Sequence, residues 1–135
     1  DEPMPTVFTR IINRELPGRF VYEDDICVAI LTIEPISPGH TMVIPRQEVD
    51  HWLDLDAETA THLMLVAQRI GRAVDDVYKP VKVGMMIAGL EVPHVHIHVT
   101  PMSTVYDLDF ARADRSPDPA DLDEAARLIS LALER

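Results

Sequence analysis

The sequence predicts an α+β fold, with one antiparallel sheet of about five strands, one long helix packed against it and short helices at the ends. First, apolar residues recur every three to four positions over residues 57–78, as on a helix that buries one face. Second, several short apolar segments are bounded by turn residues, and short connections between strands are typical of antiparallel pairing. Third, a chain of 135 residues without repeats or low-complexity tracts is expected to form a single domain over residues 1–135.

The N-terminal part of the chain is expected to contain one short helix and three strands. Residues 6–12 form the helix, which ends near Pro17 and Gly18. The strands are expected over residues 20–22, 26–33 and 41–45, the first two as a hairpin. His40 opens the third strand, and Pro45 marks its end because proline has no N–H to donate to a ladder.

The long helix over residues 57–78 has recognisable ends. Asp54 or Asp56 can cap its first turn, and Pro80 follows its last turn. Two more strands are expected after it, over residues 81–88 and 94–101.

The C-terminal part is expected to be irregular over residues 102–117 and helical after that. Asp118 can accept hydrogen bonds from free N–H groups of the first turn, and Pro119 takes the first helical position. The buried face of this last helix is expected to consist of Leu122, Ala126, Ile129 and Leu133.

The composition argues against several classes of partner and location. Asp and Glu number 23 and Lys and Arg number 12, so the formal net charge of -11 disfavours binding to nucleic-acid polymers and to anionic lipid. No apolar run approaches the roughly 20 residues of a membrane span. The single cysteine, Cys27, allows neither an intramolecular disulfide nor a cysteine-based zinc site, and the first residues do not resemble a signal peptide. A reducing, cytoplasmic setting is therefore expected.

Three of the six histidines fall within five residues, and they carry the main functional signal. On a strand His94, His96 and His98 would share one face, while Val95 and the other apolar residues between them would anchor the opposite face in the core. Three imidazoles in a row offer no packing advantage and repel one another when protonated, so a purely structural role is disfavoured.

Two kinds of chemistry suit this spacing. Alternate histidines can bind a metal ion such as Zn²⁺, with His40 or Glu91 as a further ligand, which would make the protein a metal-dependent hydrolase. Alternatively, a neutral imidazole can attack phosphorus and form a covalent intermediate, while its neighbours donate hydrogen bonds to the phosphate oxygens. The spacing alone is compatible with both.

Three segments in order resemble the histidine triad (HIT) family. They are residues 8–23, residues 38–45 (Pro-Gly-His-Thr-Met-Val-Ile-Pro) and residues 94–101 (His-Val-His-Ile-His-Val-Thr-Pro), and the order and spacing match over residues 7–101. The resemblance implies a homodimer whose sheet continues from one subunit to the other. It also implies a nucleotide hydrolase or transferase that acts on the α-phosphate of a nucleotide conjugate, by cleaving a phosphoramidate or phosphoanhydride bond, without a metal or other cofactor.

The resemblance also assigns roles to residues. His96 would be the nucleophile that becomes nucleotidylated, His94 would orient it, and His98 would contact the phosphate and the scissile atom. His40 would be the outlying fourth histidine. The apolar slot for the base would be formed by Val7, Phe8, Ile11, Leu16, Ile30, Leu31 and Ile33.

The sequence departs from the family pattern at two places in the nucleotide site. Thr32 stands where typical members hold the ribose hydroxyls with an acidic or amide residue, and Glu34 lies nearby. The loop before the triad is shortened to Gly89, Leu90 and Glu91, so Leu90 replaces an amide and Glu91 brings a carboxylate near the phosphate. These departures make a non-catalytic nucleotide-binding protein the second alternative.

The other chemistry-bearing side chains have structural interpretations. His51 is expected on the surface and His62 on the long helix, and Cys27 is expected to be a small buried residue rather than a reactive thiol. The last helix lies beyond the resemblance and would cover either its own sheet or the partner subunit.

Overall fold

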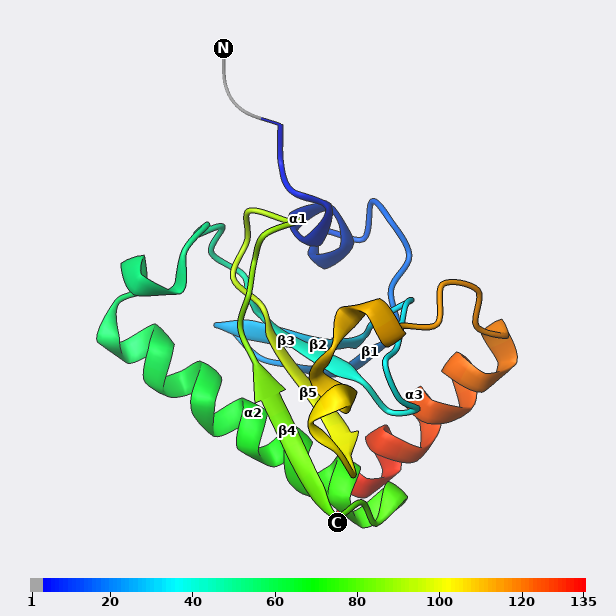
Figure 1. Ribbon diagram of the computed structural model, residues 1–135. Helices are drawn as coiled ribbons and strands as arrows, with labels where there is room; N and C mark the ends of the chain where they lie inside the picture. The colour runs from blue at the N-terminus through cyan, green and yellow to red at the C-terminus, as the bar shows by residue number, and fades with distance from the viewer. Residues whose placement is uncertain (1–3) are drawn as a thin grey trace.

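A five-stranded antiparallel sheet lies at the centre of the protein, as the computed structural model shows for residues 4–135 (Figure 1). The strands are β1 (Phe20–Glu23), β2 (Cys27–Leu31), β3 (Thr41–Pro45), β4 (Lys82–Met86) and β5 (Ile97–Met102). Their order across the sheet is β1-β2-β3-β5-β4, and every neighbouring pair is antiparallel. The predicted α+β fold with a sheet of five antiparallel strands is confirmed, and β4 is left as an edge strand.

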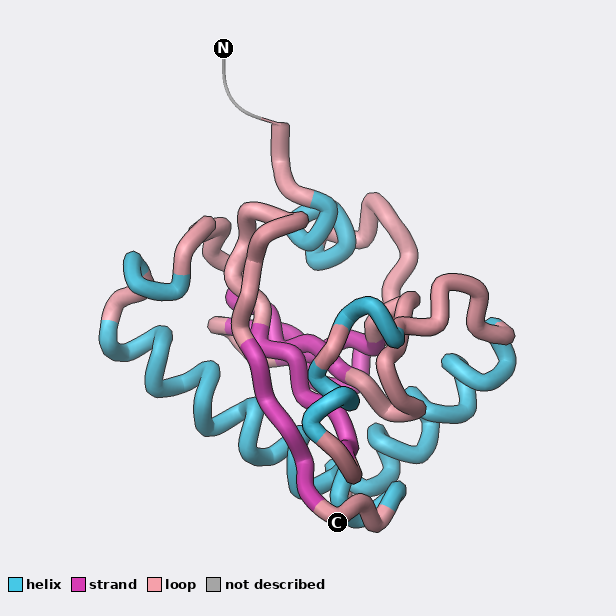
Figure 2. The backbone as a smooth tube through the Cα atoms, in the orientation of Figure 1, coloured by secondary structure: helices cyan, strands magenta, loops and turns pink. Residues whose placement is uncertain are grey.

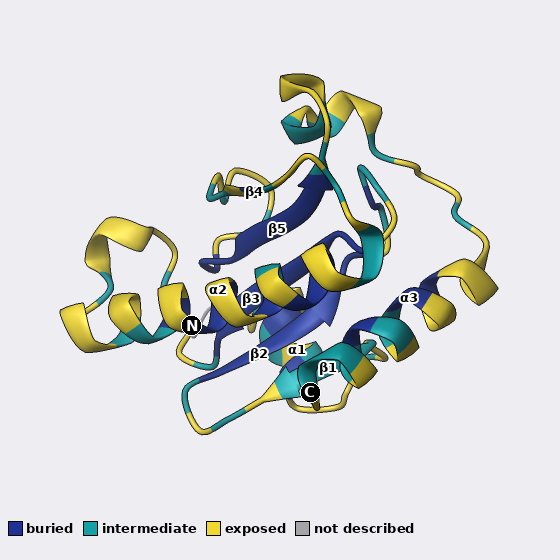
Figure 3. Ribbon diagram, turned by 90° about the horizontal axis from the view of Figure 1, so that it is seen from below, coloured by how far each residue is buried: buried dark blue, intermediate teal, exposed yellow. Residues whose placement is uncertain are grey.

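Helices lie on both faces of this sheet (Figures 1 and 2). The α-helices are α1 (Val7–Ile12), α2 (Ala57–Tyr78) and α3 (Pro119–Leu133), and short 3₁₀ helices are η1 (Trp52–Asp54), η2 (Val105–Leu108) and η3 (Phe110–Arg112). The helices α2 and α3 pack on one face against the main core, as Figure 3 shows from below. The short helix α1 packs on the other face.

The two faces follow from the alternation of side chains along the strands. In β2, Cys27, Ala29 and Leu31 point into the main core, whereas Val28 and Ile30 point to the opposite face. Around β5, the predicted core residues Val95, Ile97 and Val99 are all at most 4% exposed and lie in the main core. Their anchoring turns the intervening histidines toward the face that carries α1.

Most element boundaries agree with the prediction. The helix α2 and the strand β3 have the predicted bounds, and Asp56, one of the two predicted caps, accepts from the Thr59 N–H at 2.7 Å. Asp118 caps α3 with Pro119 in its first turn, and Thr6 caps α1 rather than belonging to it. The predicted strands 26–33 and 81–88 are shorter in the structure, and the irregular segment 102–117 contains η2 and η3.

The predicted strand over residues 94–101 is wrong at its start. β5 begins at Ile97, because the His94 N–H bonds back to the Val92 carbonyl at 2.8 Å and Pro93 has no N–H. His94 and His96 therefore lie in an extended segment before the strand, and only His98 lies within it.

Over residues 4–135, no helix combines the length and the apolar character that crossing a membrane requires. Asp1, Glu2 and Pro3, on which the prediction about a signal peptide partly rests, lie outside the described residues.

Candidate functional site

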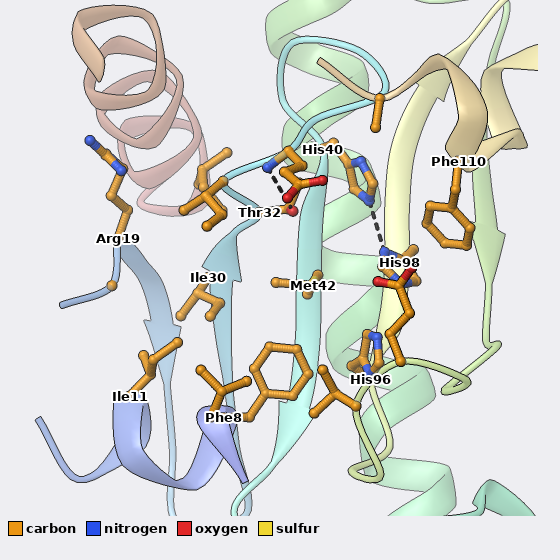
Figure 4. A pocket seen from close by; sticks show the side chains of 18 of the residues that line it. Phe8, Ile11, Arg19, Ile30, Thr32, His40, Met42, His96, His98 and Phe110 are labelled. Atoms are coloured by element: carbon orange, nitrogen blue, oxygen red, sulfur yellow. Dashed lines mark hydrogen bonds between the residues drawn. The ribbon is translucent and has the colours of Figure 1, made fainter. Parts of the chain in front are cut away.

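A pocket of about 850 Å³ opens on the face of the sheet opposite α2 (Figure 4). This volume is within the range of small-molecule sites, roughly 300–1,000 Å³. The strands β2, β3 and β5 form its floor, α1 and the loop before the triad form two walls, and the segment around η3 forms a third. The pocket thus collects residues from nearly the whole length of the chain.

Every residue that the resemblance places at the nucleotide lines this pocket, together with three of the four predicted histidines. These residues are Val7, Phe8, Ile11, Leu16, Ile30, Leu31, Thr32, Ile33, Gly89, Leu90, Glu91, His40, His96 and His98. The fourth histidine, His94, is fully buried beneath the pocket and does not line it.

His40 and His98 form a hydrogen-bonded pair on the pocket floor. The Ile36 N–H can only donate, and it lies 3.1 Å from His40 Nδ1, so this nitrogen accepts. The proton of neutral His40 therefore sits on Nε2, which lies 2.8 Å from His98 Nδ1 and donates to it (Figure 4). Neutral His98 must then carry its own proton on Nε2, so it presents a donor to the pocket.

His96 is held in the opposite tautomer by the backbone. Its Nδ1 lies 2.7 Å from the carbonyl oxygen of His94, which can only accept, so the proton of neutral His96 sits on Nδ1. Its Nε2 is left with a free lone pair, and the ring lies 4.8 Å from Phe8 and 4.7 Å from His98, measured between centroids. The pocket therefore contains a nucleophilic nitrogen next to an N–H donor.

Both nitrogens of His94 are used inside the protein. Nε2 lies 2.8 Å from the Pro45 carbonyl and must donate to it, while Nδ1 lies 2.7 Å from the Thr6 hydroxyl. His94 is thus a buried link between the end of β3 and the start of α1, and it faces no ligand.

Burial keeps these imidazoles neutral. It lowers the pKa of His40 to about 4 and that of His98 to about 3, and the repulsion from neighbouring imidazoles adds to both shifts. Burial also lowers the pKa of His94 and His96, although the hydrogen bonds to the Pro45 and His94 carbonyls oppose it. At neutral pH the lone pair of His96 Nε2 is consequently free of a proton.

The apolar end of the pocket lies between α1 and the strands. Phe8 is buried and Ile11 half-buried on α1, and Ile30 and Met42 face them from β2 and β3 (Figure 4). A flat aromatic group fits such a slot, whereas the N–H donor of His98 at the other end suits an anion.

The two departures from the family pattern lie on the pocket rim. Thr32 is buried and its hydroxyl accepts from the Glu34 N–H at 3.2 Å, while the Glu34 carboxylate pairs with Arg115. Leu90 is 94% exposed, and the Glu91 carboxylate raises the pKa of His96, against the larger effect of burial. The carboxylate therefore acts electrostatically on His96.

Sequence reasoning missed the wall that follows β5. Phe110 contacts the His98 ring at 4.8 Å between centroids, and Arg115 reaches Glu34 across the rim. Arg19 also lines the pocket and is paired with Asp123 of α3 at 2.8 Å. The short polar segment 102–117 has no periodic pattern, and only the lone Phe110 in it could have indicated a contact.

The sequence model of the HIT domain matches residues 13–105 of this chain. The chain belongs to the HIT family. An uncharacterised HIT-like protein of Borreliella burgdorferi is 34% identical over 116 residues, which cover 81% of this chain and 84% of the relative.

Solved structures of HIT proteins share the fold. A Zn-bound histidine triad family protein from Mycobacterium smegmatis has a TM-score of 0.81 at 32% identity, covering 95% of this chain and 92% of that one. A hypothetical histidine triad nucleotide-binding protein from Sulfolobus tokodaii also has a TM-score of 0.81, at 28% identity over 94% and 91% of the two chains. The predicted family is therefore confirmed.

The triad of this HIT protein does not fit a metal ion. Both nitrogens of His94 and of His40 and the Nδ1 atoms of His96 and His98 are already hydrogen-bonded, so two ring nitrogens of these four histidines face the pocket. Glu91 does not join His96 and His98 in a group whose donor atoms lie within 4.8 Å of one another in the described part of the chain. A catalytic zinc site uses three protein ligands. The metal-dependent hydrolase, our first alternative, is thus not supported by the donor set.

A different group of potential ligands occurs on the other face of the sheet. Asp24, Cys27 and His62 place donor atoms within 4.8 Å of one another. The Asp24 carboxylate there accepts from the Tyr22 hydroxyl at 2.7 Å and from the N–H groups of Ile26 and Cys27, and it pairs with His62 Nε2 at 2.6 Å. Hydrogen bonding within the fold accounts for this group, and for His62, without a ligand.

Proposed function

We propose that this HIT protein binds a nucleotide conjugate in the pocket and cleaves the bond between its α-phosphate and the leaving group through a nucleotidyl-His96 intermediate. The observation that carries the proposal is the pair of opposite tautomers. The His94 carbonyl leaves a lone pair on His96 Nε2, and His40 leaves a proton on His98 Nε2. A nucleophile and a donor side by side are what displacement at phosphorus requires.

The reaction has two balanced steps. Neutral His98 donates its Nε2–H to a phosphate oxygen, while its Nδ1 continues to accept from His40. His96 Nε2 attacks phosphorus, the bond to the leaving group breaks, and an amine leaving group takes a proton from a water molecule. The hydroxide so formed attacks the same phosphorus, the Nε2–P bond breaks, and His96 is regenerated. The products are a nucleoside monophosphate and the free leaving group.

The proposed binding mode follows from the shape of the pocket. The base occupies the apolar slot between Phe8 and Ile30, and the phosphate lies at His96 and His98. The ribose then lies near Thr32, whose hydroxyl already accepts from Glu34 and so has its own proton to donate. The Glu34 carboxylate is paired with Arg115 and so is not free to bind the ribose. The ribose is therefore held by fewer hydrogen bonds than an acidic residue in place of Thr32 would provide.

Hydrolysis of adenosine 5′-phosphoramidate tests the proposal. We expect turnover by the unaltered protein to persist in a strong chelator and to be lost in His96→Ala, because the alanine has no lone pair to attack phosphorus. His51→Ala is the matched control, since that histidine is exposed. Turnover that the chelator abolishes would instead support the metal-dependent hydrolase. Nucleotide binding without turnover by the unaltered protein would support the non-catalytic alternative.

We also propose that the protein is a homodimer joined through β4 and α2. The strand order leaves β4 without a second neighbour, and exposed apolar side chains line a groove beside it: Met64 of α2 and Met85 of β4 are 50% and 44% exposed. A second copy that pairs with this edge would continue the sheet and cover these side chains.

Sedimentation equilibrium tests the dimer. The unaltered protein should show twice the 15.2 kDa mass of the chain, and Met85→Lys combined with Met64→Lys should show the single mass. Leu131→Lys, which alters an exposed apolar residue on α3, should leave the dimer intact. A single mass for the unaltered protein would refute this interface.

A further inference from the structure

We infer that Thr6 is a positioning residue for the proposed reaction, because its hydroxyl fixes His94, whose carbonyl in turn orients the nucleophile His96. The inference rests on the proposed function, and it concerns a residue that precedes α1 and does not line the pocket. It follows from a chain of hydrogen bonds between the surface and the triad.

The chain begins at the carboxylate of Glu48. Its Oε1 accepts from the Thr6 backbone N–H at 2.8 Å and from the Thr9 hydroxyl at 2.7 Å. The same hydrogen bonds lower the pKa of this carboxylate, so it stays ionised. Glu48 lies shortly after β3, so its hydrogen bonds connect the first turn of α1 to the segment that follows β3.

The direction of each hydrogen bond can be worked out from its partners. The Thr6 hydroxyl oxygen accepts from the Thr9 N–H at 3.1 Å, which is the cap of α1. The Thr6 hydroxyl proton has two possible acceptors, His94 Nδ1 at 2.7 Å and the Thr9 hydroxyl oxygen at 3.3 Å, and the shorter distance favours His94. Because the Pro45 carbonyl takes the Nε2–H of His94, Nδ1 has only an acceptor lone pair to offer. The donor and the acceptor match without any rearrangement.

The His94 ring helps to anchor a segment that is not part of a strand. The strand β5 begins at Ile97, and the His94 N–H bonds to Val92, two residues earlier. The Val95 N–H, in the same planar peptide unit as the His94 carbonyl, bonds to the Val49 carbonyl at 2.8 Å. That bond and the fully buried ring, fixed at both nitrogens, together determine where the His94 carbonyl points. That carbonyl accepts from His96 Nδ1 at 2.7 Å and sets the tautomer and the direction of Nε2.

The arrangement also joins the base slot to the nucleophile. Thr6 caps the helix that carries Phe8, and the Phe8 ring contacts both His94 and His96, with centroids 5.8 and 4.8 Å away. Figure 1 shows α1 beside the segment that leads into β5. A base seated against Phe8 thus rests on the helix whose N-cap residue is hydrogen-bonded to the triad.

Replacing the Thr6 hydroxyl tests the inference. In Thr6→Val, we expect kcat for adenosine 5′-phosphoramidate to fall about tenfold, equivalent to about 1.4 kcal/mol in the barrier. KM should change less than about twofold, because the base slot is retained. Thr6→Ser keeps the hydroxyl and should restore kcat. Thr61→Val, which removes an exposed hydroxyl on α2, is the matched control.

The proton on His96 Nδ1 gives a readout that needs no turnover. In the unaltered protein this proton is held in a buried hydrogen bond, so its NMR signal should be protected from exchange with water. The signal should broaden or disappear in Thr6→Val and return in Thr6→Ser. Thr6→Gly, which helix caps tolerate, provides the same test if the valine variant does not fold.

The two readouts separate failure of the inference from failure of the proposed function. An unchanged His96 signal and unchanged kcat in Thr6→Val would overturn the role of Thr6. A His96 signal that depends on Thr6, in a protein that never turns over the substrate, would uphold the positioning role and overturn the proposed reaction.

Discussion

Acid should destabilise this protein through His40, a fully buried imidazole whose pKa in the folded state is lowered from 6.5 to about 4. In the unfolded chain this histidine takes up a proton as the pH falls below 6.5, whereas in the folded protein it stays neutral until about pH 4. The stability present above pH 6.5 is therefore lost progressively as the pH falls toward 4. Since one pKa unit corresponds to about 1.4 kcal/mol, the loss from His40 between pH 7 and pH 4.5 is about 2 kcal/mol.

The variant His40→Gln isolates this contribution. Its side-chain amide can accept from the Ile36 N–H and donate to His98, as His40 does, but it does not titrate. Urea unfolding at pH 7 and pH 4.5, at one protein concentration, gives the free energy of unfolding for both proteins. The unaltered protein should lose about 2 kcal/mol more than the variant between the two pH values.

A second histidine variant is the control for this pH dependence, and one outcome would refute the burial argument. His51→Gln removes an exposed histidine and should keep the pH dependence of the unaltered protein. If His40→Gln and the unaltered protein lost the same stability between pH 7 and pH 4.5, the burial argument for the histidine pair would be refuted. The same argument for His98, whose folded pKa is about 3, would fail with it.

Three further predictions concern other parts of the structure. Burial raises the pKa of Cys27 to about 12, so a thiol reagent should label it only after urea unfolds the chain; rapid labelling of the native protein would contradict its burial. Gly39→Ala should lower the melting temperature by about 10 °C, because Gly39 has φ +95° and an added Cβ would overlap the Tyr78 ring, whereas an unchanged melting temperature would show that this loop adjusts freely. Burial also lowers the pKa of His96, so kcat/KM for the proposed reaction should stay constant as the pH is lowered through the ordinary histidine pKa of 6.5, and a decline that begins above pH 6.5 would mean that His96 is solvated.

The periodicity of apolar residues predicted the features that depend on burial of one face of a single helix or strand. The repeat along α2 and the alternation at Val95, Ile97 and Val99 each express burial of one face, and both are confirmed. Strand ends were harder to predict, because they depend on partners rather than on hydropathy. β2 begins at Cys27, one residue later than predicted, after a turn in which the Asp24 side chain accepts from the N–H groups of Ile26 and Cys27.

Only the part of the site that lies within short sequence motifs could be predicted. The resemblance named the residues that line the pocket, but no local pattern could reveal that Thr6, 88 positions before His94, would donate to its ring. Hydrogen bonds between residues far apart in sequence depend on the finished fold. The tautomers of the four histidines decide which ring nitrogens donate and which accept, and they too depend on the finished fold.

Phe110 and Arg115 complete the pocket from outside the part of the chain that matches the HIT domain, which ends at residue 105. The histidines and their backbone partners are thus separated along the chain from one wall that a leaving group or ribose would meet. If the proposed reaction holds, substitutions, insertions or deletions in this wall can alter which conjugates fit while the Nε2 atoms of His96 and His98 stay where they are. Two HIT proteins with the same triad can accordingly diverge in substrate preference through a segment that comparison of the shared domain does not include.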